Sequence, residues 1–167
     1  MKALLLIPII TLTLYLIYVY WRHGMTKSIS ATYKKLTGLE KPLFTITMWA
    51  VAIPIMMVGI DSVPNNWSEV LFFLAGFGIC LVGASPAFWT NKMELTAHLI
   101  GSYGGIGMGM IASLVYLYSP LTLTLVAIYA AFVASQMLTT KLRIKHHIYW
   151  IEVVALLVIC IILNQQV

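Results

Sequence analysis

Six apolar runs, five of them long enough for a helix to cross a bilayer and the sixth shorter, dominate this sequence. A transmembrane helix needs about 20 predominantly apolar residues. In lipid each backbone polar group must be hydrogen-bonded internally, and the runs are too long for barrel strands and lack their alternation. The sequence therefore predicts an all-α membrane protein, a bundle of six transmembrane helices. The predicted spans are Ala3–Trp21, Pro42–Asp61, Val70–Trp89, His98–Tyr118, Leu121–Thr140 and Ile148–Leu163.

The composition excludes the other classes of protein. Hydrophobic residues make up 61% of the chain and charged residues only 9%, whereas a soluble domain is about 25% charged. The chain is too apolar for a water-facing surface and also for disorder. The six spans leave no room for a folded domain outside the membrane. We therefore expect residues 1–167 to form a single transmembrane domain.

The basic residues predict the orientation of this domain. With six spans, nine of the ten lysines and arginines fall in the first, third and fifth connections, and only Lys2 lies on the other side. Basic connections stay in the cytoplasm. Both termini are therefore expected to be extracytoplasmic, with the chain in a bacterial inner membrane. Topology also explains the net charge of +5, so nucleic-acid binding is not expected.

A stripe of small residues marks the fourth predicted span. Gly101, Gly105, Gly109 and Ser113 recur every four residues and therefore share one helix face. Small residues at this spacing let two helix backbones approach closely. The stripe predicts helix packing, either inside the bundle or at a seam with a second copy or another membrane protein.

Four polar residues are predicted near the cytoplasmic face of the bundle: Glu152, His98, Gln136 and Ser102. Ionisable groups within spans are costly and usually face the bundle interior or a wet cavity. Glu152 is suited to a proton relay, a substrate cation site, or a metal site shared with His98 and His147. The alternative is an interfacial carboxylate that snorkels or pairs with Lys145.

The first connection alternates basic, hydroxyl and apolar residues. We expect it to lie in the membrane interface, with Ile29 and Tyr33 dipping into lipid and its lysines on anionic headgroups. Alternatively, its hydroxyl groups bind an anionic headgroup.

Two short strings carry a family resemblance. Ser28–Tyr33 follows the first span, and Gly83–Phe88 closes the third, with His98 in the next. In these strings the chain resembles short uncharacterised polytopic membrane proteins of bacteria and their phages. The resemblance implies a multi-pass membrane protein and carries no activity.

A second likeness rests on the stretch from Glu94 to His98 and on the pair His146 and His147. These residues are similar to part of the site of the alkaline-ceramidase and adiponectin-receptor class of membrane metal hydrolases. That class uses several histidines, a serine and an aspartate at one membrane face. This chain lacks the paired HxxxH of the class and has no aspartate soon after His98.

No catalytic or cofactor-binding motif is present, since the chain has no GxSxG and no glycine-rich phosphate loop. The sequence therefore predicts neither an enzyme nor a bound cofactor. Its partner is expected to be the lipid bilayer. The predicted function is transport or permeation of a small solute or ion. The alternatives are a non-catalytic interaction or oligomerisation protein that uses the glycine stripe, and a lipid-acting metal-dependent hydrolase.

Overall fold

The computed structural model describes residues 2–62, 67–116, 119–139 and 143–165, and these ranges form an all-α bundle without strands. Two short 3-10 helices, η1 (Ser30–Lys34) and η2 (Gly38–Glu40), lie between the first two long helices. The fourth predicted span is a composite helix of α4, a π-helical segment and α5. The main elements are α1 (Lys2–His23), α2 (Lys41–Ser62), α3 (Trp67–Ala84), α4 (Lys92–Leu99), the π segment (Ile100–Gly104), α5 (Gly105–Tyr116), α6 (Pro120–Leu138) and α7 (His147–Asn164).

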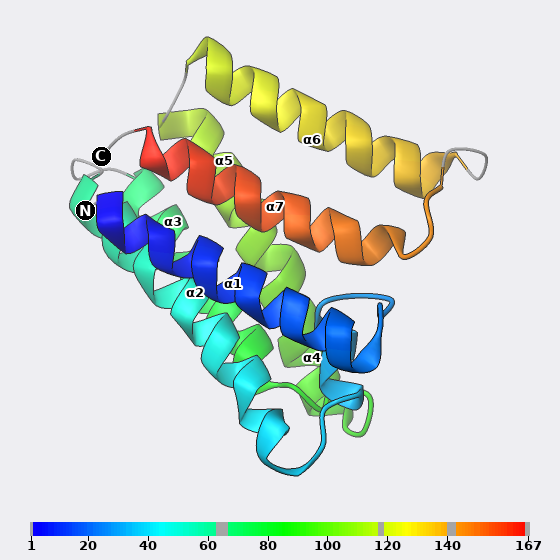
Figure 1. The fold of residues 1–167 in the computed structure, drawn as a ribbon. Coiled ribbons are helices and arrows are strands. Elements are labelled where there is room, and N and C mark those ends of the chain that lie inside the picture. The colour runs from blue at the N-terminus through cyan, green and yellow to red at the C-terminus, as the bar shows by residue number, and fades with distance from the viewer. Residues whose placement is uncertain (1, 63–66, 117–118, 140–142, 166–167) are drawn as a thin grey trace.

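The helices run up and down, so that the two chain ends meet at one end of the bundle (Figure 1). The connections after α1, α3 and α6 lie at the opposite end. The centre of the bundle is formed by α3, which packs on both α2 and α5. At the edge, α6 packs mainly on α7 and α5 and is the least buried of the long apolar helices.

Five helices in the described residues are long and apolar enough to cross a membrane. Among the predicted spans the exception is the third, whose apolar helix Glu69–Ala84 is shorter. The prediction extended this span to Trp89, but α3 ends at Ala84. Pro86 explains the difference, because a proline disfavours helical geometry in the residue before it. The segment from Ser85 to Thr90 therefore leaves the helix.

The next helix begins at Lys92, six residues before the predicted start at His98. Asn91 is its N-cap, and the Asn91 side chain accepts a hydrogen bond of 2.9 Å from the N–H of Met93. Glu94, in the first turn, accepts from the N–H of Ala87 at 3.2 Å. The predicted loop is thus partly helix, and His98 lies about two turns inside it.

The tightest helix contact joins α3 to the composite helix through glycines. A Cβ atom added to Gly101 would lie 2.5 Å from the carbonyl oxygen of Gly78, and one added to Gly78 would lie 2.7 Å from that of Gly101. Gly105 is similarly close to the backbone of Ala75. Only residues without a side chain fit here, because the two backbones are in direct contact.

The rest of the glycine stripe also packs inside the bundle. Gly109 faces Ile159 of α7, and the buried Ser113 hydroxyl donates a 2.7 Å hydrogen bond to the carbonyl of Gly109. The stripe is therefore covered by α3 and α7 of the same chain. The π segment, which contains Gly101, widens the helix at this crossing; such π-bulges interrupt α-helices frequently at functional sites.

We predict that Gly101→Ala destabilises the protein while Gly107→Ala does not. The new methyl group at position 101 would meet the α3 backbone, and overpacking typically costs about 1–3 kcal/mol. At position 107 nothing lies within 4 Å, and alanine is the better helix former by about 1 kcal/mol. Thermal unfolding in detergent, followed by circular dichroism, measures both. Equal melting temperatures for the two variants would contradict the assigned crossing.

Candidate functional site

A cavity of about 40 Å³ lies inside the bundle, below the first connection. Its wall combines residues of that connection with residues of α2, α3, the composite helix and α7. Most of the wall is apolar, and the polar exceptions are Glu152, Ser30 and Ser102. The lining residues are Ile29, Ser30, Met48, Ile79, Val82, Ser102, Ile106, Glu152 and Leu156.

Glu152 is the ionisable residue of this wall. It is half-buried in the second turn of α7, and its Oε2 accepts a 2.6 Å hydrogen bond from the N–H of Ile29. Hydrogen bonds to a charged acceptor are the shorter and stronger class. In the described part of the chain Glu152 is in no ion pair, and Lys145 does not reach it. A backbone amide is therefore the partner of this carboxylate.

The first connection forms one side of the cavity through Ile29 and Ser30. The backbone carbonyl of Lys27, in this connection, accepts a 3.1 Å hydrogen bond from the N–H of Tyr149. This bond joins the connection to α7 a second time. Ser30 and Thr32 are buried, and the Thr32 hydroxyl is hydrogen-bonded to the hydroxyl of Tyr15 on α1. We call the segment Thr26–Lys34 the lid, because it lines one side of the cavity and is held by both α1 and α7.

The prediction that Ile29 and Tyr33 dip into lipid is wrong. Ile29 is only 3% exposed and packs in the hydrophobic core. Tyr33 is half-buried and packs edge-on against Phe44 of α2 and beside Trp89. The reason is that the lid finds hydrogen-bond partners for its backbone inside the bundle, at Glu152 and Tyr149.

Ser102 and Glu152 are the two predicted site residues that the cavity brings together. Ser102 belongs to the π segment, and its hydroxyl donates a 3.3 Å hydrogen bond to the carbonyl of Leu99. Ser30 of the lid is the third polar residue in a wall that is otherwise apolar. Oxygen groups of this kind are the ligands of water and of hard cations.

His98 lies away from the cavity wall. It is buried, its ring stacks on that of Phe88 with 4.0 Å between centroids, and its Nδ1 is 3.3 Å from the carbonyl oxygen of Ser85. Both contacts fall on the segment between α3 and α4. His98 therefore holds this turn against the helix that follows it.

Gln136 is also buried and is engaged at the end of α6. Its Oε1 accepts from the N–H of Ile144 at 2.8 Å, and its Nε2 donates to the hydroxyl of Ser135 at 3.0 Å. Arg143 adds a 3.0 Å hydrogen bond from its Nε to the carbonyl of Gln136. These contacts fasten the residues before α7 to the end of α6.

The predicted metal candidates His98, His147 and Glu152 do not form a cluster. His147 opens α7 five residues before Glu152, so the two lie about 140° apart around the helix axis. In residues 2–62, 67–116, 119–139 and 143–165, no three His, Cys, Asp or Glu side chains are placed to hold a metal ion.

Sequence reasoning missed the lid as part of the site. Ser30 and the amide of Ile29 lie in a connection rich in lysine and hydroxyl residues, a composition typical of an exposed loop. One sequence feature did indicate burial of this segment: the six residues from Ser28 to Tyr33 include no charged side chain.

Comparisons with protein-family models, curated proteins and solved structures gave no match. The site is therefore argued from its own geometry.

We predict that Glu152→Leu loosens the lid and Glu152→Gln does not. Glutamine retains a side-chain oxygen that accepts from Ile29, whereas leucine leaves this amide without its partner. Since a hydrogen bond to a charged group contributes about 1.5–3 kcal/mol, the Leu variant should lose about tenfold or more of its amide protection in the lid. Hydrogen exchange with peptide-level mass spectrometry measures the amide protection of the lid. Unchanged lid protection in Glu152→Leu would show that the bond does not hold the lid.

Proposed function

We propose that the chain binds a proton or a small cation at Glu152 and passes it across a membrane. The observation that carries this proposal is the Glu152 carboxylate at a mostly apolar cavity, with a backbone amide rather than a basic side chain as its partner. The residue lies about 8 Å along α7 from the start of the helix. Ionisable groups at such depth in spanning helices are found on proton and ion pathways.

The size of the cavity limits the kinds of solute that it can hold. A volume of about 40 Å³ has room for water, which needs at least about 10–15 Å³ of such space. It has no room for an organic metabolite, since pockets for drug-sized ligands run to about 300–1,000 Å³. The Glu152 carboxylate is an oxygen ligand of the kind that small hard cations prefer. The proposal is therefore limited to protons and small cations.

The lid supplies a means of access on one side. Its bond to Glu152 occupies one carboxylate oxygen, and the hydroxyls of Ser30 and Ser102 stand along the same wall. A small cation on the carboxylate competes with the Ile29 amide for its negative charge, whereas a proton leaves an oxygen that still accepts from this amide. Binding of a cation therefore favours release of the lid, and an empty site favours its closure.

The proposal includes a six-span protein in a bacterial inner membrane with both termini extracytoplasmic. It rests on nine basic residues in three connections and on the position of these connections at the bundle end opposite the termini (Figure 1). The shorter α3 packs between α2 and α5, so protein rather than lipid covers much of it.

The geometry favours permeation over the two alternatives. The glycine stripe faces α3 and α7 of its own chain rather than a second protein. A metal hydrolase needs a ligand group, and the described ranges place no three candidate ligands together.

The topology gives the first test of the proposal. In a bacterial host, alkaline phosphatase fused after Val167 should be active, because it would be exported, and green fluorescent protein fused there should stay dark. The same reporters fused after Lys35 should give the opposite result. An active phosphatase at Lys35 would refute the orientation.

The transport activity is tested with purified protein in liposomes that contain a pH-sensitive dye. Under an imposed membrane potential we expect proton uptake, or sodium uptake in a parallel sodium-dye assay. Glu152→Gln should reduce this flux to the level of protein-free liposomes, since the amide carries no exchangeable charge. The variant keeps an acceptor for Ile29, so the loss would not come from an open lid.

The matched control is Glu69→Gln, which removes a carboxylate from the first turn of α3, outside the cavity wall. Its flux should equal that of the wild type. Equal flux in wild type and Glu152→Gln, or none in the wild type for either cation, would overturn the proposed function.

A further inference from the structure

A second cleft, separate from the cavity at Glu152, lies at the bundle end that carries the basic connections. It has a volume of about 530 Å³ and lies between the end of the lid, the start of α2 and the turn before α4. Both of its charged lining residues are lysines. The lining residues are Tyr33, Lys34, Leu36, Thr37, Gly38, Lys41 and Trp89.

Aromatic rings hold the two lysine side chains over the cleft. The ammonium of Lys34 lies 4.5 Å from the centre of the Trp89 ring, and that of Lys41 lies 5.7 Å from the centre of the Tyr33 ring. A cation is attracted to the face of an aromatic ring within about 6 Å. The rings themselves pack together, with centroids 5.8 Å apart. The two charges are thus placed on one rigid wall, although both lysines are exposed.

The nearest carboxylate is occupied by other groups. Glu40 accepts hydrogen bonds from the hydroxyl of Tyr18 and from the N–H of Thr37, and lies 3.3 Å from Nε2 of His23. In the described ranges neither Lys34 nor Lys41 is in an ion pair. The cleft therefore has two positive charges without a neutralising acid at its wall.

The surroundings of the cleft favour a ligand at a membrane surface. Leu39, between its lining residues in the chain, is 96% exposed. An exposed leucine of this kind, next to lysines and a tryptophan, is typical of a segment at the level of lipid headgroups. The anionic group most available there is a phosphate.

We propose that this cleft binds a phosphate anion, with Lys34 and Lys41 as the charged ligands and Tyr33 and Trp89 as the platform that positions them. The same chemistry serves the phosphate of a lipid headgroup and a free phosphate from the cytoplasm. The site is independent of Glu152 and needs no flux through the bundle.

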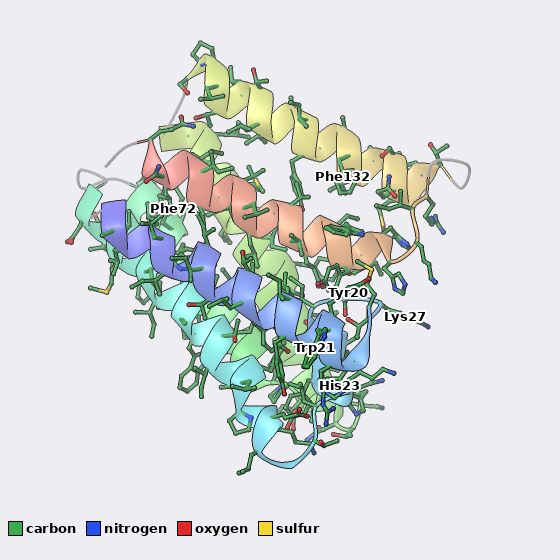
Figure 2. The ribbon with its side chains drawn as sticks, viewed as in Figure 1. Tyr20, Trp21, His23, Lys27, Phe72 and Phe132 are labelled. Atoms are coloured by element: carbon green, nitrogen blue, oxygen red, sulfur yellow. The ribbon has the colours of Figure 1, made fainter. Side chains whose placement is uncertain are left out.

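The test compares two double variants of equal charge by native mass spectrometry in neutral detergent. The site variant is Lys34→Gln with Lys41→Gln. The control is Lys27→Gln with Lys35→Gln, two exposed lysines of the same connection outside the cleft; Lys27 points away from the bundle in Figure 2. The probes are phosphatidylglycerol, zwitterionic phosphatidylcholine and inorganic phosphate.

We expect the site variant to bind phosphatidylglycerol about 25-fold less tightly than the wild type, since each lysine near an anionic surface contributes roughly a fivefold change. The control should keep most of its affinity, because its two lysines lie outside the cleft. Arginine at positions 34 and 41 should restore binding. Phosphatidylcholine should bind equally to all variants.

Competition with inorganic phosphate distinguishes a lipid headgroup from free phosphate as the ligand. Failure of inorganic phosphate to displace phosphatidylglycerol would support a lipid headgroup site. Displacement, together with binding of phosphate in the absence of lipid that is lost in the site variant, would support a soluble phosphate site. An equal loss of affinity in the site and control variants, or no loss in either, would overturn the proposal.

Discussion

The contact of α3 with the composite helix at Gly78, Gly101 and Gly105 sets the geometry of the whole bundle. Lipid tails are as apolar as the helices, so helices in a bilayer gain little from hydrophobic burial and associate through close packing instead. Here the two backbones are in contact. That contact places α3 against the π segment, and Ser102 of this segment lines the same cavity as Glu152 of α7.

The lid forms one side of this space. Although the lid connects two helices, it packs in the core of the bundle, since Ile29, Ser30 and Thr32 are all buried. Its residues Tyr33 and Lys34 contact Trp89, from the turn that His98 stacks against through Phe88. Two connections thus support each other at one end of the bundle, and both proposed binding sites lie there.

The helices could be predicted from the sequence because apolar runs of this length have few alternatives in a membrane. The ends of α3 and α4 were misplaced, although Pro86 and Asn91 carried the signals for them. The candidate site was predicted only in part. Glu152, Ser102, His98 and Gln136 share a depth in their helices, but which of them meet depends on how each helix is rotated and which helix is its neighbour. Hydropathy predicts which residues lie within a span, but it predicts neither the rotation of a helix nor its neighbours. The burial of the lid depends on Glu152, far along the chain, and no local pattern predicts it.

The hydrogen bond between Ile29 and Glu152 joins residues 123 positions apart in the chain. The lid is synthesised before α7, so the Ile29 amide and side chain can take their places in the bundle only after α7 has been added. Until then the amide lacks its carboxylate partner. Folding of this end of the bundle therefore follows the synthesis of α7 and cannot precede it.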